Sequence, residues 1–291
     1  MNRPGRIAKE DEMRRLIARL AVISSLLALT LLAGCGTESV APPPQIQPRP
    51  AMPWQAAIGE LWTSADNDAH CSAVLVARDV VVTASHCLFL ETAKRPASPH
   101  DVVFRPNVGA LQSLPPSRGV AFKAVGANLR SGKLRNEDVP RDWVLIQISP
   151  PVVAVQPISV ASLSIDGMLH LVNSGNRLVV AGYGSGPYDE LRQHEQCRLL
   201  SQHELGWFPD DSWLQLDCVI RVGDSGGAIV LLDGAGQPAL VGIIAGLATK
   251  TKTTRPMALG VNAANFLPYL KPLISEAAPE PETSLAELPL N

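Results

Sequence analysis

Three segments that lie far apart in the sequence carry the residue types of an acyl-transfer site. Ser225 lies in the glycine-rich run Gly-Asp-Ser-Gly-Gly, and His86 lies upstream in the run Thr-Ala-Ser-His-Cys. Because a serine hydroxyl is a poor nucleophile near neutral pH, it needs a histidine base and a carboxylate that orients the base. Asp142, which opens the apolar run 143–148, supplies such a carboxylate. Together the three residues predict nucleophilic catalysis by Ser225.

Two alternatives accompany this interpretation. The run around Ser225 by itself also suits an ordinary glycine-rich turn, and only its combination with His86 and Asp142 favours catalysis. Asp138 is a rival carboxylate, but it lies in the polar run Arg-Asn-Glu-Asp, which is more typical of a solvated loop. Asp142 is therefore the preferred acid.

These segments resemble the chymotrypsin/trypsin-like serine proteases, whose catalytic residues follow the order His, Asp and Ser along the chain. Residues 71–87 are similar to the family's strand, turn and histidine loop, and residues 180–184 to an early hairpin of its second barrel. Residues 240–246 and 260–261 resemble strands beside its specificity pocket. The likeness covers roughly residues 53–270 and implies an enzyme that acts on protein or peptide substrates.

The family's fold consists of two six-stranded antiparallel β-barrels, with the site in the cleft between them, and a short C-terminal helix. The resemblance places His86 and Asp142 on the first barrel and Ser225 on the second. The sequence agrees with an all-β class, because short β-branched runs recur between turn residues and no long stretch has a helical period. Pro268 would make a closing helix at 265–270 short. The β-branched runs are 73–76, 80–83, 144–148, 178–180, 228–232 and 240–244.

The resemblance implies a mechanism in which Ser225 Oγ attacks a peptide carbonyl while His86 accepts its proton. Asp142 would hold the imidazole in the productive tautomer and stabilise the imidazolium. The backbone N–H groups of Gly223 and Ser225 would donate to the oxyanion, and losing one such donor costs about 3 kcal/mol of barrier. His86 then protonates the leaving amine, and water hydrolyses the acyl-enzyme.

The sequence contains five cysteines, which leaves one odd thiol in an exported protein. Resemblance to the family's histidine-loop disulfide pairs Cys71 with Cys87. It leaves Cys197 and Cys218 for a second disulfide, once Cys35 is assigned to a lipid. A zinc site is disfavoured, because the two His-Cys dipeptides lack the usual finger spacing. We therefore expect no metal and no cofactor.

The first residues of the chain predict an export signal. Basic residues precede the apolar run 20–33, which is shorter than the roughly 20 residues that span a bilayer, and small residues follow it. Met13 is an alternative start, because the segment from it onward is a complete signal. The sequence Leu-Ala-Gly-Cys resembles a bacterial lipoprotein box, which implies that Cys35 is lipidated and anchors the protein to a membrane. Gly36, directly after the cysteine, favours the outer membrane by the same kind of resemblance.

The chain is thus expected to be organised in four parts. These are a leader at residues 1–34, a lipidated cysteine with a proline-rich tether at 35–52, a protease domain at 53–275 and a tail at 276–291. Prolines among Gln and Arg favour an extended tether, and prolines among acidic residues predict a disordered tail. We expect a monomer anchored in the bacterial cell envelope. The alternative is a plain secretory signal with an accidental cysteine, and hence a secreted protein.

Two departures from the family pattern bear on activity. The basic site for zymogen cleavage before Ile-Val-Gly-Gly is missing, and an amino terminus acylated at Cys35 cannot pair with Asp224 as the freed one does in digestive relatives. Asp224 therefore needs an internal arginine or backbone donors, and we expect activity without cleavage. Ala245 replaces a serine that normally donates to the triad aspartate, so Asp142 is expected to be held less firmly.

The residues that the resemblance assigns to the specificity pocket are apolar. Val219 stands where trypsin-like enzymes that cut after Lys or Arg carry an aspartate. With valine at this position, the pocket has no carboxylate to pair the buried cation of a Lys or Arg side chain. Val219, Ile220 and Ala245 therefore predict a preference for small or medium apolar side chains before the cleaved bond. Arg221 leaves acidic side chains as the alternative.

Composition suits an ordinary globular domain, with 46% hydrophobic and 18% charged residues in 291. The net charge of −2 gives no basic footprint for nucleic acid. Two other function classes remain open: a protease-fold binding module without catalysis, and an esterase with the same triad. The order His-Asp-Ser disfavours an α/β-hydrolase, whose serine lies in Gly-x-Ser-x-Gly. Comparing turnover of peptide and ester substrates separates these classes.

Overall fold

The computed structural model describes residues 52–63, 66–106, 114–126, 136–184, 191–194, 197–201, 211–248 and 257–276. The predicted leader, the lipidation site at Cys35, the tether up to residue 51 and the tail from residue 277 lie outside the described residues. None of the helices in the described ranges is long and apolar enough to cross a membrane.

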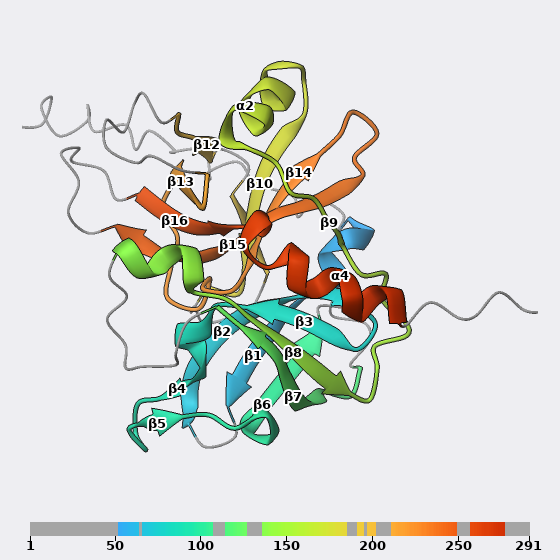
Figure 1. The fold of residues 1–291 in the computed structure, drawn as a ribbon, viewed down its shortest axis with the longest axis vertical. Helices are drawn as coiled ribbons and strands as arrows, with labels where there is room; N and C mark the ends of the chain where they lie inside the picture. Colours follow the sequence, from blue (N-terminus) through green and yellow to red (C-terminus); the bar gives the residue numbers. More distant parts are fainter. Residues whose placement is uncertain are drawn as a thin grey trace, which may run out of the picture. The chain divides into compact units, whose positions relative to one another are not determined.

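Six strands from the first half of the domain form a closed antiparallel barrel in the order β1-β2-β3-β8-β7-β6, seen in the lower half of Figure 1. The β-branched run Val-Val-Val-Thr of β3 is buried along its whole length, which suits a strand covered on both faces. β3 pairs with β8 so that Thr83 lies opposite Val144. The prediction of a six-stranded first barrel is confirmed. The strands are β1 (Ile58–Thr63), β2 (Asp66–Ala77), β3 (Val80–Thr83), β6 (Val102–Pro106), β7 (Ser117–Val125) and β8 (Val144–Ser149).

The second β unit is an eight-stranded sheet in the order β11-β10-β14-β15-β16-β13-β12, with β9 parallel to β15. Within the described strands the sheet does not close, and its end strands β11 and β12 have only three and two residues. The unit is therefore a half-barrel, and together with the closed barrel it is consistent with the expected trypsin-like fold. The strands are β9 (Ser159–Val160), β10 (Arg177–Gly182), β11 (Arg192–His194), β12 (Arg198–Leu199), β13 (Trp213–Asp217), β14 (Ala228–Leu232), β15 (Pro238–Ala248) and β16 (Met257–Asn262).

One helix in the domain was not predicted. α2 (Ile165–Asn173) lies between β9 and β10 in the chain and near the end of β10 in Figure 1. Ser164 caps it by accepting a hydrogen bond from the Gly167 N–H at 3.1 Å. Met168 is fully buried in the apolar cluster between α2 and the second unit. A helix this short depends on tertiary packing more than on its own periodicity, so its pattern in the sequence is weak.

The C-terminal helix α4 (Leu267–Glu276) is longer than the predicted segment 265–270. Pro268 lies in its first turn, where a proline costs little because the first N–H groups of a helix have no partner within it. Tyr269 packs on Trp143 with ring centroids 5.2 Å apart. The helix therefore supports the start of β8 from outside the barrel.

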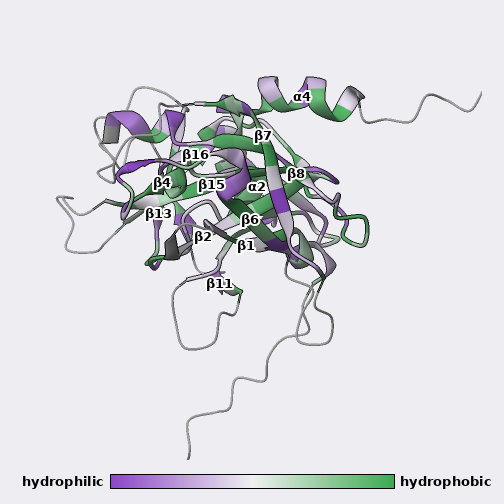
Figure 2. Ribbon diagram, turned by 90° about the horizontal axis from the view of Figure 1, so that it is seen from below, coloured by the Kyte–Doolittle hydropathy of each residue, from purple (hydrophilic) through white to green (hydrophobic). Residues whose placement is uncertain are grey.

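Short 3₁₀ turns and a small ribbon connect the main elements, and Figure 2 shows that much of the strand ribbon in both units is apolar. The larger apolar cluster contains buried side chains from the first barrel, from β14 to β16 and from α4. This continuous core holds the two units together, so that residues of both can meet at one site. The connecting elements are η1 (Pro53–Ala57), η2 (Ser85–Leu88), β4 (Phe89–Leu90), β5 (Arg95–Pro96), η3 (Pro99–Asp101), η4 (Asn136–Arg141) and η5 (Ala263–Asn265).

Candidate active site

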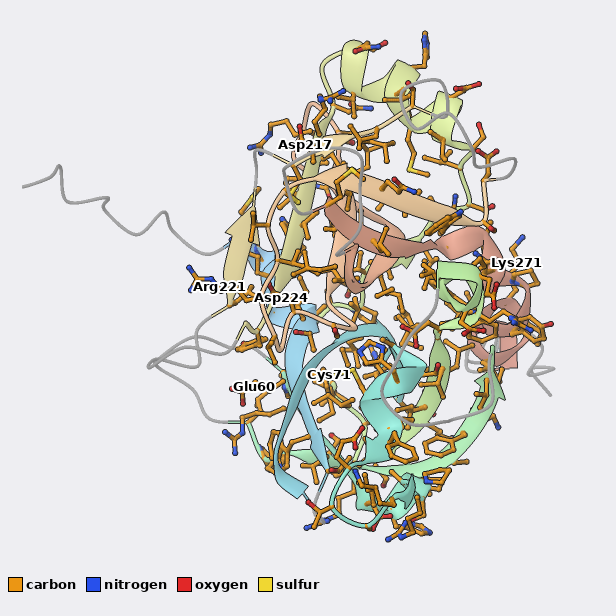
Figure 3. The ribbon with its side chains drawn as sticks, turned by 90° about the vertical axis from the view of Figure 1, so that its left-hand side faces the viewer. Glu60, Cys71, Asp217, Arg221, Asp224 and Lys271 are labelled. Carbon is orange, nitrogen blue, oxygen red and sulfur yellow. A yellow bond between two sulfur atoms is a disulfide. The ribbon has the colours of Figure 1, made fainter. Side chains whose placement is uncertain are left out.

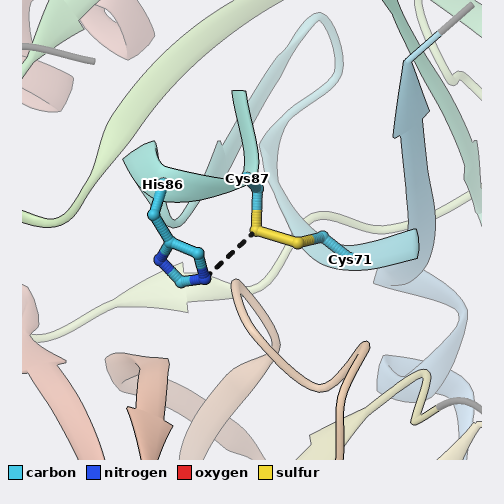
Figure 4. Close-up of side chains that lie close together, drawn as sticks. All are labelled: Cys71, His86 and Cys87. Atoms are coloured by element: carbon cyan, nitrogen blue, oxygen red, sulfur yellow. Dashed lines mark hydrogen bonds between the residues drawn. A yellow bond between two sulfur atoms is a disulfide. The ribbon is translucent and has the colours of Figure 1, made fainter. Parts of the chain in front are cut away.

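The short turn η2, which comes just after β3, carries His86. Cys87 of the same turn forms the predicted disulfide with Cys71 on β2, with the two Cα atoms 6.2 Å apart. Figure 4 shows the imidazole beside this bridge, with His86 Nε2 3.9 Å from Cys87 Sγ. The bridge ties the turn to a barrel strand and so restricts the position of the histidine. The other predicted disulfide, Cys197–Cys218, is also present.

Asp142 follows η4 and comes directly before the buried run of β8. The pairing of β8 with β3 brings it next to the histidine segment. Its side chain is fully buried and accepts three hydrogen bonds. Asp142 Oδ2 accepts from His86 Nδ1 at 2.7 Å, while Oδ1 accepts from the His86 N–H at 2.9 Å and from the Ser85 hydroxyl at 2.8 Å. These donors compensate the carboxylate for its loss of water and fix the plane of the imidazole.

The same contacts set the proton affinity of His86. Burial lowers the pKa of the imidazole, but the negative charge of Asp142 and the hydrogen bond to it together outweigh burial, so the pKa lies above its ordinary value of 6.5. With Nδ1 donating to the carboxylate, Nε2 is the nitrogen that can accept a proton. The His86 side chain keeps 27% of its surface exposed, so this second nitrogen is not sealed in the core.

Ser225 is half-buried in a turn between β13 and β14 that is shaped by glycines. Gly223 and Gly226 have φ angles of 97° and 79°, which residues with a side chain rarely adopt. A Cβ on Gly226 would overlap the Ser72 carbonyl oxygen and the Thr83 hydroxyl. The turn therefore requires glycine both for its backbone angles and for its close approach to the first barrel.

The turn reaches the histidine segment across the boundary between the two β units. The Ser225 carbonyl accepts a hydrogen bond from the Ser72 N–H of β2 at 2.7 Å. It also lies 3.8 Å from Cys87 Sγ, the atom that contacts His86 Nε2. Within the described chain, Ser225 Oγ and His86 form no hydrogen bond with each other, which is common in sites without substrate. The fold thus places the backbone of the Ser225 turn against the segment that carries His86, which in turn contacts Asp142.

Two backbone donors of the turn remain available. Among the residues that the structure describes, the N–H groups of Gly223 and Ser225 have no hydrogen-bond partner, whereas the amides of Asp224 and Gly226 donate to backbone carbonyls. The two available amides are the ones that the resemblance assigns to the oxyanion. Fixed donors of this kind stabilise charge that develops on a carbonyl oxygen.

Asp224 is fully buried beside Ser225. Its Oδ2 accepts a hydrogen bond from the Arg221 N–H at 2.7 Å. Gly182 and Gly184 leave room for the carboxylate, since a Cβ at either position would lie 3.1 or 3.0 Å from Oδ1. Figure 3 shows Asp224 and Cys71 where the second unit meets the first barrel. A backbone donor, one of the two kinds of partner expected from the sequence, therefore holds Asp224 from within its own turn.

The rival carboxylate, Asp138, has a different partner. It pairs with Arg141 of the same turn η4, with 3.2 Å between the guanidinium nitrogen and the carboxylate oxygen. Of the two candidate acids, Asp142 is therefore the one in contact with His86.

Ser85 was not singled out in the sequence, although it directly precedes the histidine. Its hydroxyl donates to Asp142. The expectation that Ala245 leaves Asp142 weakly held is therefore wrong, because Ser85 supplies a hydroxyl donor to this carboxylate. The run Thr-Ala-Ser-His-Cys contained the signal, since a serine next to a catalytic histidine can reach the same carboxylate.

The residues predicted to line a specificity pocket have different environments. Val219 is 55% exposed, whereas Ile220 and Ala245 are 3% and 2% exposed. Ile220 packs in the cluster beside α2, and Ala245 packs in the larger core. Val222, directly before Gly223, is 80% exposed and was not singled out in the sequence. The apolar pocket stays a prediction.

Cys71, His86 and Cys87 also form a cluster whose potential metal-binding atoms lie within 4.8 Å of one another. Both sulfur atoms are joined in the disulfide, however, and a metal ion is bound by the free thiolate. These three residues therefore do not fit a zinc site while the bridge is intact.

A closed antiparallel barrel and a second β unit define the fold of a serine protease. A buried Asp–His pair lies on the first unit, and a serine flanked by glycines lies on the second. The family model named Trypsin matches residues 45–269, which is most of the chain, and the protein belongs to this family. A search of curated proteins found no match. The mostly β class and the family expected from the sequence are both confirmed.

Proposed function

We propose that the protein is a serine endopeptidase that cleaves peptide bonds through an acyl-enzyme on Ser225. The observation that supports this best is the pair formed by Asp142 and His86 Nδ1 at 2.7 Å, placed beside the turn that carries Ser225. Membership of the trypsin family implies the binding of peptide substrates. No metal or cofactor enters the proposed chemistry.

In the proposed reaction, Ser225 Oγ attacks the carbonyl carbon of the peptide bond and His86 Nε2 accepts the hydroxyl proton. Asp142 stabilises the resulting imidazolium, and the N–H groups of Gly223 and Ser225 donate to the oxyanion. The imidazolium then protonates the leaving amine as the C–N bond breaks. A water molecule, deprotonated by the same imidazole, releases the acyl group and restores Ser225.

The proposal includes activity without zymogen cleavage. The Arg221 N–H at 2.7 Å from Asp224 Oδ2 supports it, because a backbone donor supplies part of what a freed ammonium would give. Intact-mass analysis of the active-site-labelled protein tests this directly. We expect the label on chains that still carry residues 36–52, and label found only on chains cut within that segment would contradict it.

We propose that the enzyme prefers small or medium apolar side chains before the cleaved bond, and that Val219, Ile220 and Ala245 contact them. A peptide library with varied residues at this position tests it, with Val219→Asp as the informative variant. We expect the variant to gain cleavage after Lys and Arg, since a carboxylate can pair a buried cation. Cleavage after acidic residues by the wild type would favour Arg221 as the recognition element instead.

The location proposed is the bacterial cell envelope, with a monomeric enzyme anchored through lipid on Cys35 and extended on the tether 36–52. The two disulfides support an oxidising compartment outside the cytoplasm. Fractionation of cells that express the wild type or Cys35→Ala tests the anchor. Release of the variant, but not of the wild type, into the soluble exported fraction is expected. Equal distribution of the two would favour a secreted protein.

The experiment that tests the central proposal is labelling of the full-length protein with a fluorophosphonate, with Ser225→Ala as the matched control. We expect labelling of the wild type alone, together with turnover of peptide substrates. Labelling with turnover of esters but not of peptides would support an esterase. A folded wild type that neither labels nor turns over substrate would support a binding module.

A further inference from the structure

Ser72 is a buried serine that the proposed chemistry does not use. It follows Cys71 on β2 and has no exposed surface. Its hydroxyl accepts a hydrogen bond from the Tyr183 N–H at 2.7 Å and donates one to the Gly223 carbonyl at 2.8 Å. Its backbone N–H donates to the Ser225 carbonyl at 2.7 Å. One residue of the first barrel therefore holds the carbonyls on both sides of Asp224.

These contacts join three parts of the molecule. Ser72 belongs to a strand of the closed barrel, Tyr183 follows β10 of the second unit, and Gly223 begins the turn that carries Ser225. Gly223 is separated from Ser72 by 151 positions in the chain. A hydroxyl can serve as acceptor and donor at once, so this side chain links the second unit to the turn while it is anchored in the first barrel.

The carbonyls that Ser72 holds belong to the same residues whose N–H groups lack a partner among the described residues, Gly223 and Ser225. A glycine at φ 97° has wide conformational freedom and needs an external contact to keep one orientation. The Gly223 carbonyl lies in the peptide plane that joins Gly223 to Asp224. Holding it fixes one side of the Gly223 Cα and so limits the rotations that can turn the Gly223 amide on the other side. Donors stabilise an oxyanion best when they are already oriented before the reaction.

We propose that Ser72 is a positioning residue that sets the geometry of the oxyanion donors through its side-chain hydroxyl. The inference rests on the proposed function, in which Ser225 is the nucleophile. Any residue other than proline at position 72 keeps the backbone bond to Ser225, whereas the bond to Gly223 needs a hydroxyl. The bond from the uncharged Ser72 hydroxyl to the Gly223 carbonyl therefore anchors the turn to the first barrel.

The test compares Ser72→Ala with Thr83→Val in the full-length protein. The Thr83 hydroxyl is also fully buried and donates to the Ser72 carbonyl at 2.7 Å, so its loss removes a hydrogen bond of similar length at the same residue. Thr83→Val leaves the Ser72 hydroxyl and its bond to Gly223 in place. It is thus a matched control for a simple loss of stability.

Two readouts are needed. The first is the kcat and KM of peptide hydrolysis, and we expect Ser72→Ala to lower kcat about 10- to 100-fold with little change in KM. This range follows because misplacing a reacting group by about 1 Å can cost on the order of 10² in rate. The second is hydrogen exchange of the bonded amides of Asp224, Gly226 and Gly227, which should speed up in Ser72→Ala and not in Thr83→Val.

An unchanged kcat in Ser72→Ala, or an equal loss in both variants, would overturn the positioning role. Unchanged exchange in the turn would overturn the contact as its anchor. A wild type without Ser225-dependent turnover is a different result, since it contradicts the proposed function and with it any catalytic effect of Ser72. In that case the exchange measurement still decides whether Ser72 holds the turn.

Discussion

The histidine segment and the serine turn reach the same site from β units of different construction. His86 and Asp142 lie on a closed barrel and contact each other directly, with a disulfide holding the histidine turn. Ser225 lies on a half-barrel, in a turn that depends on glycines with positive φ and on hydrogen bonds to Ser72 of the other unit. His86 and Asp142 are thus positioned within one barrel, whereas the turn that carries Ser225 obtains part of its positioning from the neighbouring unit.

This comparison implies different responses to substitution. Changes in the histidine segment should alter proton transfer while leaving its geometry largely intact, because several contacts support each residue there. Changes in the serine turn should alter geometry first, because the turn depends on the backbone angles of its glycines and on hydrogen bonds that each have a defined direction. Substitutions in the two segments should therefore separate these two responses.

The largest expected effect is that of Asp142→Asn, which should lower kcat about 10⁴-fold. In proteases with this triad, a neutral amide at that position leaves the histidine in the wrong tautomer. Asp138→Asn is the matched control, since Asp138 pairs with Arg141 and does not contact His86. Peptide hydrolysis measured for both variants checks the prediction. An equal loss in the two would contradict the choice of Asp142 as the acid.

Gly226→Ala should reduce kcat by about 10² to 10³, as large as the loss of an oxyanion donor. A Cβ would overlap the Ser72 carbonyl oxygen and the Thr83 hydroxyl, and φ is 79°. Backbone strain of this kind costs about 1–3 kcal/mol, so thermal unfolding should also occur at a lower temperature. Gly234→Ala is the control, because nothing lies within 4 Å of a Cβ there. Wild-type activity in Gly226→Ala would show that the turn tolerates displacement.

Ser85→Ala should lower kcat by about tenfold, because the loss of one hydrogen bond to a charged group costs about 1.5–3 kcal/mol and two donors from His86 remain on Asp142. Ser117→Ala removes a comparable buried hydroxyl, which donates to the Pro150 carbonyl at 2.7 Å, away from the triad. Both variants should lose stability in denaturant unfolding, Ser117→Ala the less because its hydroxyl donates to a neutral carbonyl. A similar loss of kcat in both would reduce Ser85 to a structural role.

The smallest effect expected at neutral pH concerns protonation of His86. Since Asp142 raises the pKa of the imidazole above 6.5, the neutral base should form only above that higher pKa, and kcat/KM should increase with pH through it. Asp142→Asn removes the charge, so the pKa should fall. Titration of the imidazole signals by NMR in both proteins measures this shift. A wild-type pKa at or below 6.5 would contradict the prediction.

The same pKa shift determines the sign of a stability effect. The protonated His86 interacts favourably with Asp142 in the folded state, so its contribution is fully present below the unfolded-state pKa of about 6.5. It is lost as pH increases through the higher folded-state pKa. The stability difference between wild type and Asp142→Asn should therefore shrink from acidic toward alkaline pH.

Much of the fold was predictable because local pattern and burial agree. The runs 80–83 and 228–232 form β3 and β14 with the predicted bounds, since β-branched residues buried on both faces favour strands. The helix α2 was missed because its stability comes from packing of Met168 in the core, which a nine-residue pattern does not reveal.

The sequence by itself determined the residue types of the site and their order along the chain, because short motifs carry both. The family resemblance of these motifs implied the cysteine pairs. Only the tertiary structure decided that Ser85 supports Asp142, that Ser72 reaches Gly223, and that Val219 is exposed. The physical reason is that hydrogen bonds have short reach and strict direction. Residues 151 positions apart, such as Ser72 and Gly223, meet only after both β units have packed on a common core.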